Sequence, residues 1–76
     1  MADPKRGYVA VRQLDANEIR ELKPIITTRD LAGIGGLSMS TAQQMLRAGK
    51  FKTATRIGHA WRLSKAEALS FFGLEG

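Results

Sequence analysis

Cysteine is absent from this chain of 76 residues, and histidine occurs only once, at His59. Without cysteine there is no disulfide framework and no thiolate metal site, and one histidine alone provides no metal centre. No serine has a plausible base and an orienting acid nearby in the sequence. We therefore expect no metal, no cofactor and no enzymatic activity, with the cytoplasm as the default location.

Long apolar runs are missing as well, because the longest extend over only a few residues. Such runs are too short to span a membrane, and the N-terminal sequence "MADPKRGYVAV" lacks the apolar core of a signal peptide. A chain of this length forms one small domain, which argues against a pocketed enzyme. We expect no membrane partner and no export.

Acidic residues are absent from the stretch between Leu31 and Ala66, in which six basic residues fall. These are Arg47, Lys50, Lys52, Arg56, Arg62 and Lys65. The rest of the chain holds six basic and seven acidic residues, so the net charge of +5 arises entirely in this stretch. A solvated surface ordinarily interleaves the two signs, so this segregation favours an electrostatic footprint for phosphate groups.

Residues 1–24 are predicted to form an N-terminal arm that can include a short helix. The segment "MADPKRG" is polar, and "YVAVRQL" suits a short edge strand or an extended segment. In "LDANEIREL", Asp15 followed by Glu18 is a capping-box pattern, which predicts a short helix that ends before Pro24. Residues 25–76 are then predicted to form the main domain.

Two further helices are predicted on either side of a glycine turn. Thr27, with Asp30 three residues later, marks the start of the first, and Gly35 and Gly36 turn the chain out of it.

The second of these helices begins at a serine cap, either Ser38 or Ser40, and ends at Gly49. An inward stripe is predicted at positions i, i+3 and i+4, which are Ala42, Met45 and Leu46. The other side of the helix presents small polar and basic side chains, namely Ser40, Gln43, Gln44 and Arg47.

From residue 51 to residue 63 the residue types are those typical of strands. Gly58 followed by His59 suits a two-residue hairpin loop of type II′, in which glycine comes first. Ser64 followed by Glu67 is another capping-box pattern and predicts a closing helix that stops at Gly73. The predicted fold is therefore mainly α with a small β-hairpin, in the order helix, tight turn, helix, hairpin, helix.

A helix, a glycine-bearing turn and a second helix with a polar and basic outer face are what a helix-turn-helix needs to enter a DNA major groove. Gln43 and Gln44 can each bond adenine bidentately, and Arg47 can bond guanine or a phosphate. Ser40, near the helix start, can contact a phosphate or a base. An ordinary polar helix face is the alternative, since glutamine is a good helix former.

The predicted hairpin adds cations beside this helix. Arg56, His59 and Arg62 near its tip can reach a minor groove or its flanking phosphates, and Gly58 allows close backbone approach. Trp61 either stacks on a sugar or base or packs into the core, and the scarcity of large side chains favours the core. The predicted DNA-binding residues are Ser38, Ser40, Thr41, Gln43, Gln44, Arg47, Lys50, Lys52, Arg56, Gly58, His59 and Arg62.

Two stretches carry a resemblance to a known family, "TTRDLAGIGGLSMSTAQQMLRAGKF" and "RIGHAWRLSKAEALSFF". From about Ile26 to Phe72 the chain resembles the excisionase/MerR-like winged helix-turn-helix family. The matching turn glycine, helix cap, helix-ending glycine, wing glycine and aromatic-basic pair are Gly36, Ser38, Gly49, Gly58 and Trp61-Arg62. Where the family has a second large apolar residue before the turn this chain has Gly35, which implies a shorter or less tightly packed first helix.

The resemblance implies a phage- or plasmid-encoded protein of the bacterial nucleoid that acts as a recombination directionality factor. Such a protein binds double-stranded DNA at several adjacent sites, bends it and biases an integrase toward excision. The implied partners are DNA, an integrase and further copies of the protein bound cooperatively on DNA. Two alternatives stay open, a small transcriptional regulator with the same fold and the DNA-recognition module of a packaging or partition complex.

Overall fold

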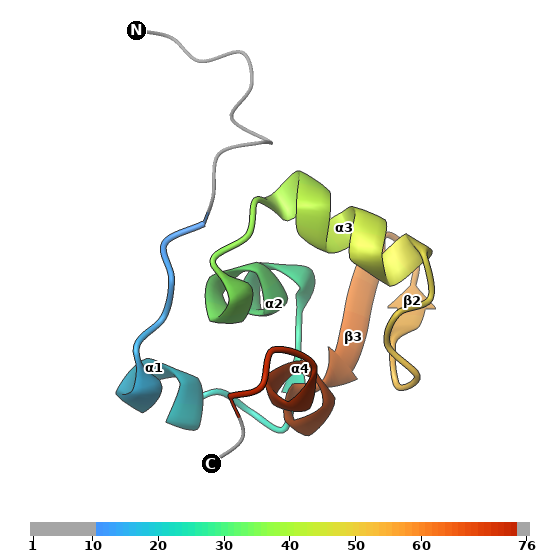
Figure 1. Ribbon diagram of the computed structural model, residues 1–76. Coiled ribbons are helices and arrows are strands. Elements are labelled where there is room, and N and C mark those ends of the chain that lie inside the picture. The colour runs from blue at the N-terminus through green and yellow to red at the C-terminus, as the bar shows by residue number, and fades with distance from the viewer. Residues whose placement is uncertain (1–10, 75–76) are drawn as a thin grey trace, which may run out of the picture.

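The computed structural model describes residues 11–74, which form four helices and a three-stranded antiparallel sheet. In chain order the elements are α1 (Ala16–Arg20), β1 (Ile25–Ile26), α2 (Thr28–Gly35), α3 (Met39–Arg47), β2 (Thr55–Ile57), β3 (Ala60–Ser64) and α4 (Lys65–Phe71). Figure 1 shows α3 on one side of the molecule, α1 and α4 on the other, and α2 between them. No helix within residues 11–74 has the length and apolar character that crossing a membrane requires.

Helix α2 lies at the centre of the core. Its start is the predicted capping box, in which the Thr27 hydroxyl accepts from the Asp30 N–H at 3.3 Å and the Asp30 carboxylate accepts from the Thr27 N–H at 3.2 Å. Buried residues occupy most of the helix. The core that α2 shares with the other elements consists of Ile26, Leu31, Ala32, Ile34, Ala42, Leu46, Phe51, Leu63 and Ala68.

Strand β1 was not predicted from the sequence. Ile25 pairs with Ser64 and Ile26 pairs with Leu63, so that β3 becomes the central strand in the order β1-β3-β2. Ile26 and Leu63 are buried on the inner face of the sheet, whereas Ile25 is 57% exposed. With this third strand the fold is mixed α/β rather than mainly α. The sequence did not reveal β1, because a two-residue strand is too short to produce a periodic pattern.

Two glycines of α2 make room for neighbouring side chains. A Cβ atom added at Gly35 would lie 2.5 Å from Cζ of Phe72, and one added at Gly33 would lie 3.0 Å from Cγ of Leu14. The expectation of a shorter or loosely packed helix at Gly35 is therefore wrong. Helix α2 continues through Gly35, and the Phe72 ring fills the space that a larger residue would occupy.

The described part of the predicted arm packs onto the rest of the molecule. The Val11 N–H donates to the Leu37 carbonyl at 2.8 Å, and the Leu14 N–H donates to the Gly33 carbonyl at 2.9 Å. Residues 11–14 form no strand, and the remainder of the segment predicted as an edge strand lies outside the described residues. The first ten residues of the predicted arm also lie outside them.

Helix α1 begins at the predicted capping box. The Asp15 carboxylate accepts from the Glu18 N–H at 2.8 Å, and the Glu18 carboxylate accepts from the Asp15 N–H at 3.0 Å. Arg12 also pairs with Glu18 at 2.7 Å. The hydrogen bond from Arg12 is the main reason that the pKa of the Glu18 carboxyl lies below its ordinary value.

Candidate nucleic-acid interface

Helix α3 is oriented by a tight turn and a serine cap. Gly36 has a φ of 65° and ends α2 in the left-handed conformation, and the Leu37 N–H returns to a carbonyl of α2 at 2.8 Å. The Ser38 hydroxyl accepts from the Thr41 N–H at 3.1 Å and donates to the Thr41 hydroxyl at 3.0 Å. Ser38, and not Ser40, is therefore the cap. Because Ser38 is only 6% exposed, it positions the helix and presents little surface to a ligand.

The two sides of α3 differ as the sequence predicted. Ala42 and Leu46 are buried, and Met45 is half-buried against the core. The opposite side includes the exposed side chains of Gln44 and Arg47.

Only one of the two glutamines of α3 lies in the middle of its outer side. Ser40, Gln44 and Arg47 follow the spacing i, i+4, i+7, so they form one line along that side. Gln43 is half-buried, and it lies about 100° around the helix from Gln44. The structure therefore places Gln44 on the outer line and Gln43 at its flank, with Thr41 exposed on the other flank.

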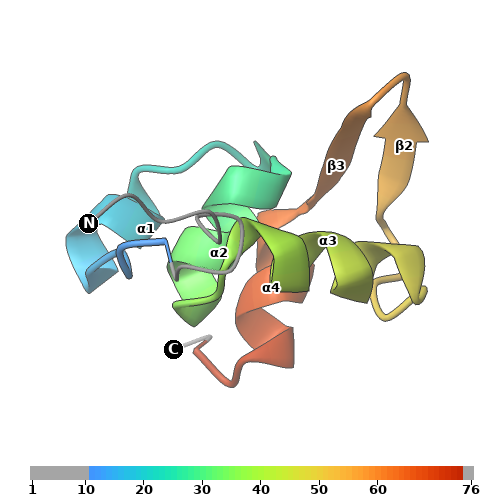
Figure 2. The same ribbon diagram turned by 90° about the horizontal axis from the view of Figure 1, so that it is seen from above.

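The hairpin of β2 and β3 projects away from the helices, as Figure 2 shows. Ile57 pairs with Ala60, so Gly58 and His59 form the predicted two-residue loop. Gly58 has a φ of 62°, and among the described residues only glycines have a positive φ. This combination is the one expected for a type II′ turn. Gly58 and His59 are both exposed at the tip.

The two arginines of the hairpin lie on opposite faces. Arg56 pairs with Trp61, and Arg62 pairs with Thr55. Direct partners in antiparallel strands share a face, and successive residues alternate between faces. Arg56 and Arg62 are both exposed, but they therefore point to different sides of the hairpin. Trp61 is half-buried and packs against the core, which supports the structural role that the sequence favoured for it.

The connection between α3 and β2 presents two more cations on an anchored backbone. Gly49 has a φ of 76° and follows the cap of α3, as predicted. Lys50 and Lys52 are exposed, whereas Phe51 between them is 3% exposed. The Phe51 ring lies against the Phe71 ring with a centroid distance of 4.8 Å. The two lysines thus stand on either side of a residue that is fixed in the core.

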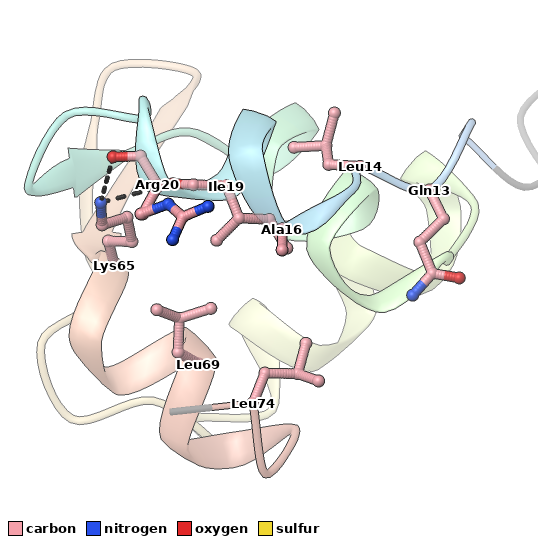
Figure 3. A pocket seen from close by; sticks show the side chains of 8 residues that line it. All are labelled: Gln13, Leu14, Ala16, Ile19, Arg20, Lys65, Leu69 and Leu74. Atoms are coloured by element: carbon pink, nitrogen blue, oxygen red, sulfur yellow. Dashed lines mark hydrogen bonds between the residues drawn. The ribbon is translucent and has the colours of Figure 1, made fainter. Parts of the chain in front are cut away.

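Lys65, the sixth cation of the basic stretch, lies apart from the other five. Its ammonium group donates to the carbonyl groups of Ile19 and Arg20 at 3.4 Å and to that of Leu22 at 3.0 Å. These carbonyls belong to the end of α1 and the residues after it, on the side of the molecule away from α3 (Figures 1 and 3). Lys65 therefore satisfies carbonyl groups at the end of α1 and does not extend the basic surface.

A cavity of about 540 Å³ lies between α1 and α4, as Figure 3 shows. Its lining is mostly apolar and consists of Gln13, Leu14, Ala16, Ile19, Arg20, Lys65, Leu69 and Leu74. The cavity contains none of the predicted DNA-binding residues. Within residues 11–74, no three side chains of the metal-ligating types His, Asp and Glu come together in a group that could hold an ion.

Sequence reasoning missed a cluster formed by Thr53 and Glu67. The Ser64 hydroxyl accepts from the Glu67 N–H at 3.3 Å, which is the predicted cap of α4. The Glu67 carboxylate, however, accepts from the N–H groups of Lys52 at 2.5 Å and Thr53 at 2.9 Å, and from the Thr53 hydroxyl. The capping box predicted for Ser64 and Glu67 is therefore only half formed, because the carboxylate binds the loop before β2.

The Glu67 carboxyl group is ionised at neutral pH. Burial opposes its ionisation, but the hydrogen bonds from Thr53 and Lys52 outweigh that effect, and the pKa of Glu67 lies below its ordinary value. The sequence does contain the Ser64-x-x-Glu67 pattern that marks a helix start. That pattern does not indicate the actual partners of the carboxylate, Lys52 and Thr53, which lie 15 and 14 positions earlier in the chain.

In comparisons with known proteins, no family model, no curated protein and no solved structure matches the chain.

Proposed function

We propose that the protein binds double-stranded DNA in a sequence-specific manner as a winged helix-turn-helix protein, with α3 as the recognition helix and the β2–β3 hairpin as the wing. One observation carries the proposal. The outer line of α3, the loop of Lys50 and Lys52 and the projecting hairpin (Figure 2) form a continuous stretch of chain with five exposed cations, and residues 31–66 contain no acidic residue. Such a surface attracts the phosphates of a duplex.

Helix α3 is suited to read bases in the major groove. Arg47 can bond O6 and N7 of guanine, and Gln44 can bond N6 and N7 of adenine. Ser40 stands one turn further toward the helix start and can contact a base or a phosphate. Because Gln43 lies at the flank, the proposal assigns base reading to Gln44 and not equally to both glutamines.

The hairpin is suited to the neighbouring minor groove. A β-ribbon that enters this groove edge-on has one face toward each of the two sugar-phosphate backbones. Since Arg56 and Arg62 lie on opposite faces, each can approach the phosphates of a different strand. His59 and the Gly58 backbone at the tip would then lie deepest, while Lys50 and Lys52 would bind phosphates between the two grooves.

The biological role proposed is that of an excisionase-type recombination directionality factor. It would bind adjacent sites cooperatively, bend the DNA and bias an integrase toward excision. This part rests on the family resemblance. A transcriptional regulator would use the same contacts on DNA, so the two roles are separated by the process that the protein changes.

The proposed base readout is tested by selecting duplexes from a random-sequence library on the wild-type protein and then measuring affinities by gel shift. Arg47→Ala and Gln44→Ala should each lower affinity for the selected duplex by about ten-fold or more, with a much smaller effect on a random duplex. Gln43→Ala is the matched control and should change the affinity much less. Equal losses on both duplexes would refute base reading by α3, and a library without enrichment would refute sequence specificity.

The proposed role in recombination has its own test. DNA from the genomic neighbourhood of the gene should give a ladder of complexes in a gel shift, because several copies bind side by side. Addition of the protein to an integrase from the same element should raise the yield of excised product. Repression of a nearby promoter without any change in excision would instead favour the transcriptional regulator.

A further inference from the structure

The loop over residues 48–54 connects α3 directly to the β2 strand of the hairpin, whereas β3 is held by its pairing with β1. A winged helix-turn-helix protein reads two grooves at once, so the position of the wing decides whether both sets of contacts form in register. Any group that fixes this loop therefore acts on recognition from a distance. The relevant group in this chain is the Glu67 carboxylate on α4.

Glu67 joins three parts of the chain. One carboxylate oxygen accepts from the Lys52 N–H at 2.5 Å, and the other accepts from the N–H of Thr53 at 2.9 Å and from its hydroxyl. The same Thr53 hydroxyl oxygen accepts from the Ser64 N–H at 3.0 Å. The loop is thereby bonded both to the end of β3 and to the first turn of α4. A carboxylate suits this role because each of its two oxygen atoms accepts hydrogen bonds.

The charge of Glu67 makes its location informative. It is the sole acidic residue between Leu31 and Leu74, and it binds the backbone of the loop that carries Lys50 and Lys52. A carboxylate near a phosphate-binding surface weakens the attraction of DNA. Its presence is understandable if the order it imposes on the loop outweighs that repulsion.

We propose that Glu67 is a positioning residue for DNA recognition, which holds the loop at Lys52 and Thr53 and so fixes the wing at the spacing from α3 that one duplex sequence requires. The inference rests on the proposed function. It assigns to Glu67 no contact with DNA, and it assigns to Thr53 the role of relay between Glu67 and Ser64.

Electrostatics alone and positioning predict opposite results for Glu67→Gln. The substitution raises the net charge of +5 by one unit, which by itself strengthens binding to any duplex. Positioning predicts weaker binding to the selected duplex, because the amide NH₂ group of glutamine faces a backbone N–H where the carboxylate had an acceptor. We expect the preference for the selected over the random duplex to fall by about ten-fold or more.

Three further variants separate the two effects. Glu21→Gln makes the same charge change at an exposed position after α1 and should leave the preference unchanged. Thr53→Val removes the relay hydroxyl without any change of charge and should lower the preference as Glu67→Gln does. Thr53→Ser keeps the hydroxyl and should restore most of the preference.

A second readout needs no DNA. Amide hydrogen exchange at Lys52 and Thr53 should quicken by about ten-fold or more in Glu67→Gln, while exchange in α2 stays close to that of the wild type. Unchanged exchange at both amides would refute the proposal that Glu67 holds the loop. A parallel rise of both affinities in Glu67→Gln and Glu21→Gln would refute its role in recognition.

The two proposals fail in different ways. A wild-type protein without any preference between duplexes would refute the proposed function, and with it the effect of Glu67 on discrimination. A wild type with a clear preference that Glu67→Gln retains would refute only the positioning role.

Discussion

Gly35 lies so close to Phe72 that the effect of Gly35→Ala on the free energy of unfolding should change sign when Phe72 is replaced by leucine. A Cβ atom at residue 35 would lie 2.5 Å from Cζ and 2.8 Å from Cε1 of Phe72. Carbon atoms in contact are normally about 3.5–4.0 Å apart, so the ring has to move. Its freedom is limited because it packs edge-on against the Phe71 ring, with a centroid distance of 5.2 Å. Overpacking of this kind costs about 1–3 kcal/mol.

The same substitution removes a glycine from a helix, which by itself contributes about 1 kcal/mol of stability. Gly35→Ala should therefore lower the free energy of unfolding of the wild type by up to about 2 kcal/mol, the difference between these two effects. In a Phe72→Leu background the two Phe72 atoms are gone and only Cγ of Leu37, at 3.1 Å from the added Cβ, stays close, so Gly35→Ala should instead raise the free energy of unfolding by up to about 1 kcal/mol. Urea unfolding followed by the fluorescence of Trp61 measures both. Stabilisation of the wild type, or the same change in both backgrounds, would refute the reasoning.

Two other predictions concern the contacts of charged side chains. Lys65→Met keeps the apolar stem but removes the donors to the carbonyls of Ile19, Arg20 and Leu22, so it should speed hydrogen exchange selectively in α1; uniform acceleration across the protein would contradict this. The pKa values of Glu18 and Glu67 lie below normal in the folded protein, so their ionised carboxylates stabilise it. This stabilisation is complete above the ordinary glutamate pKa of about 4.3 and is lost as the pH falls through the lowered pKa values. Urea unfolding at a series of pH values should show that loss, and the loss should be smaller in Glu67→Gln; a free energy of unfolding that is flat across this range in the wild type would contradict it.

The parts of the fold that the sequence predicted correctly depend on neighbouring residues. The caps at Asp15, Thr27 and Ser38 each use a hydrogen bond to a residue three positions later, so the pattern and the contact lie in the same few residues. The hairpin loop at Gly58 and His59 is local in the same sense. The inward stripe of α3 was also visible, because its period follows from helix geometry.

The features that the sequence did not reveal depend on residues far apart in the chain. Strand β1 is defined by its pairing with Leu63 and Ser64, and its two isoleucines give no pattern of their own. Gly35 was read as a weak point because the Phe72 ring that fills its space lies in another helix. Glu67 was read as half of a capping box, although its carboxylate binds the loop before β2.

The candidate site was predictable as a set of residue types but not as an arrangement. The basic stretch includes the exposed cations of α3, the loop and the hairpin, but it also includes Lys65, whose ammonium group binds carbonyls at the end of α1 and just after it. The prediction from the sequence treated Gln43 and Gln44 alike, and it did not place Arg56 and Arg62 on opposite faces of the hairpin. The half-burial of Gln43 and the strand register of the hairpin show these distinctions.

Nuclear magnetic resonance of the ¹⁵N-labelled protein, titrated with a short random-sequence duplex, shows whether α3 and the hairpin form the DNA-binding surface. The electrostatic part of binding does not require the operator, so a random duplex is a sufficient probe. We expect the largest shift changes at the outer residues of α3, the loop of Lys50 and Lys52 and the hairpin. These changes should diminish as salt is added, and α1 and the lining of the cavity should stay unchanged. Shift changes centred on α1 and α4, or none at low salt, would contradict this expectation.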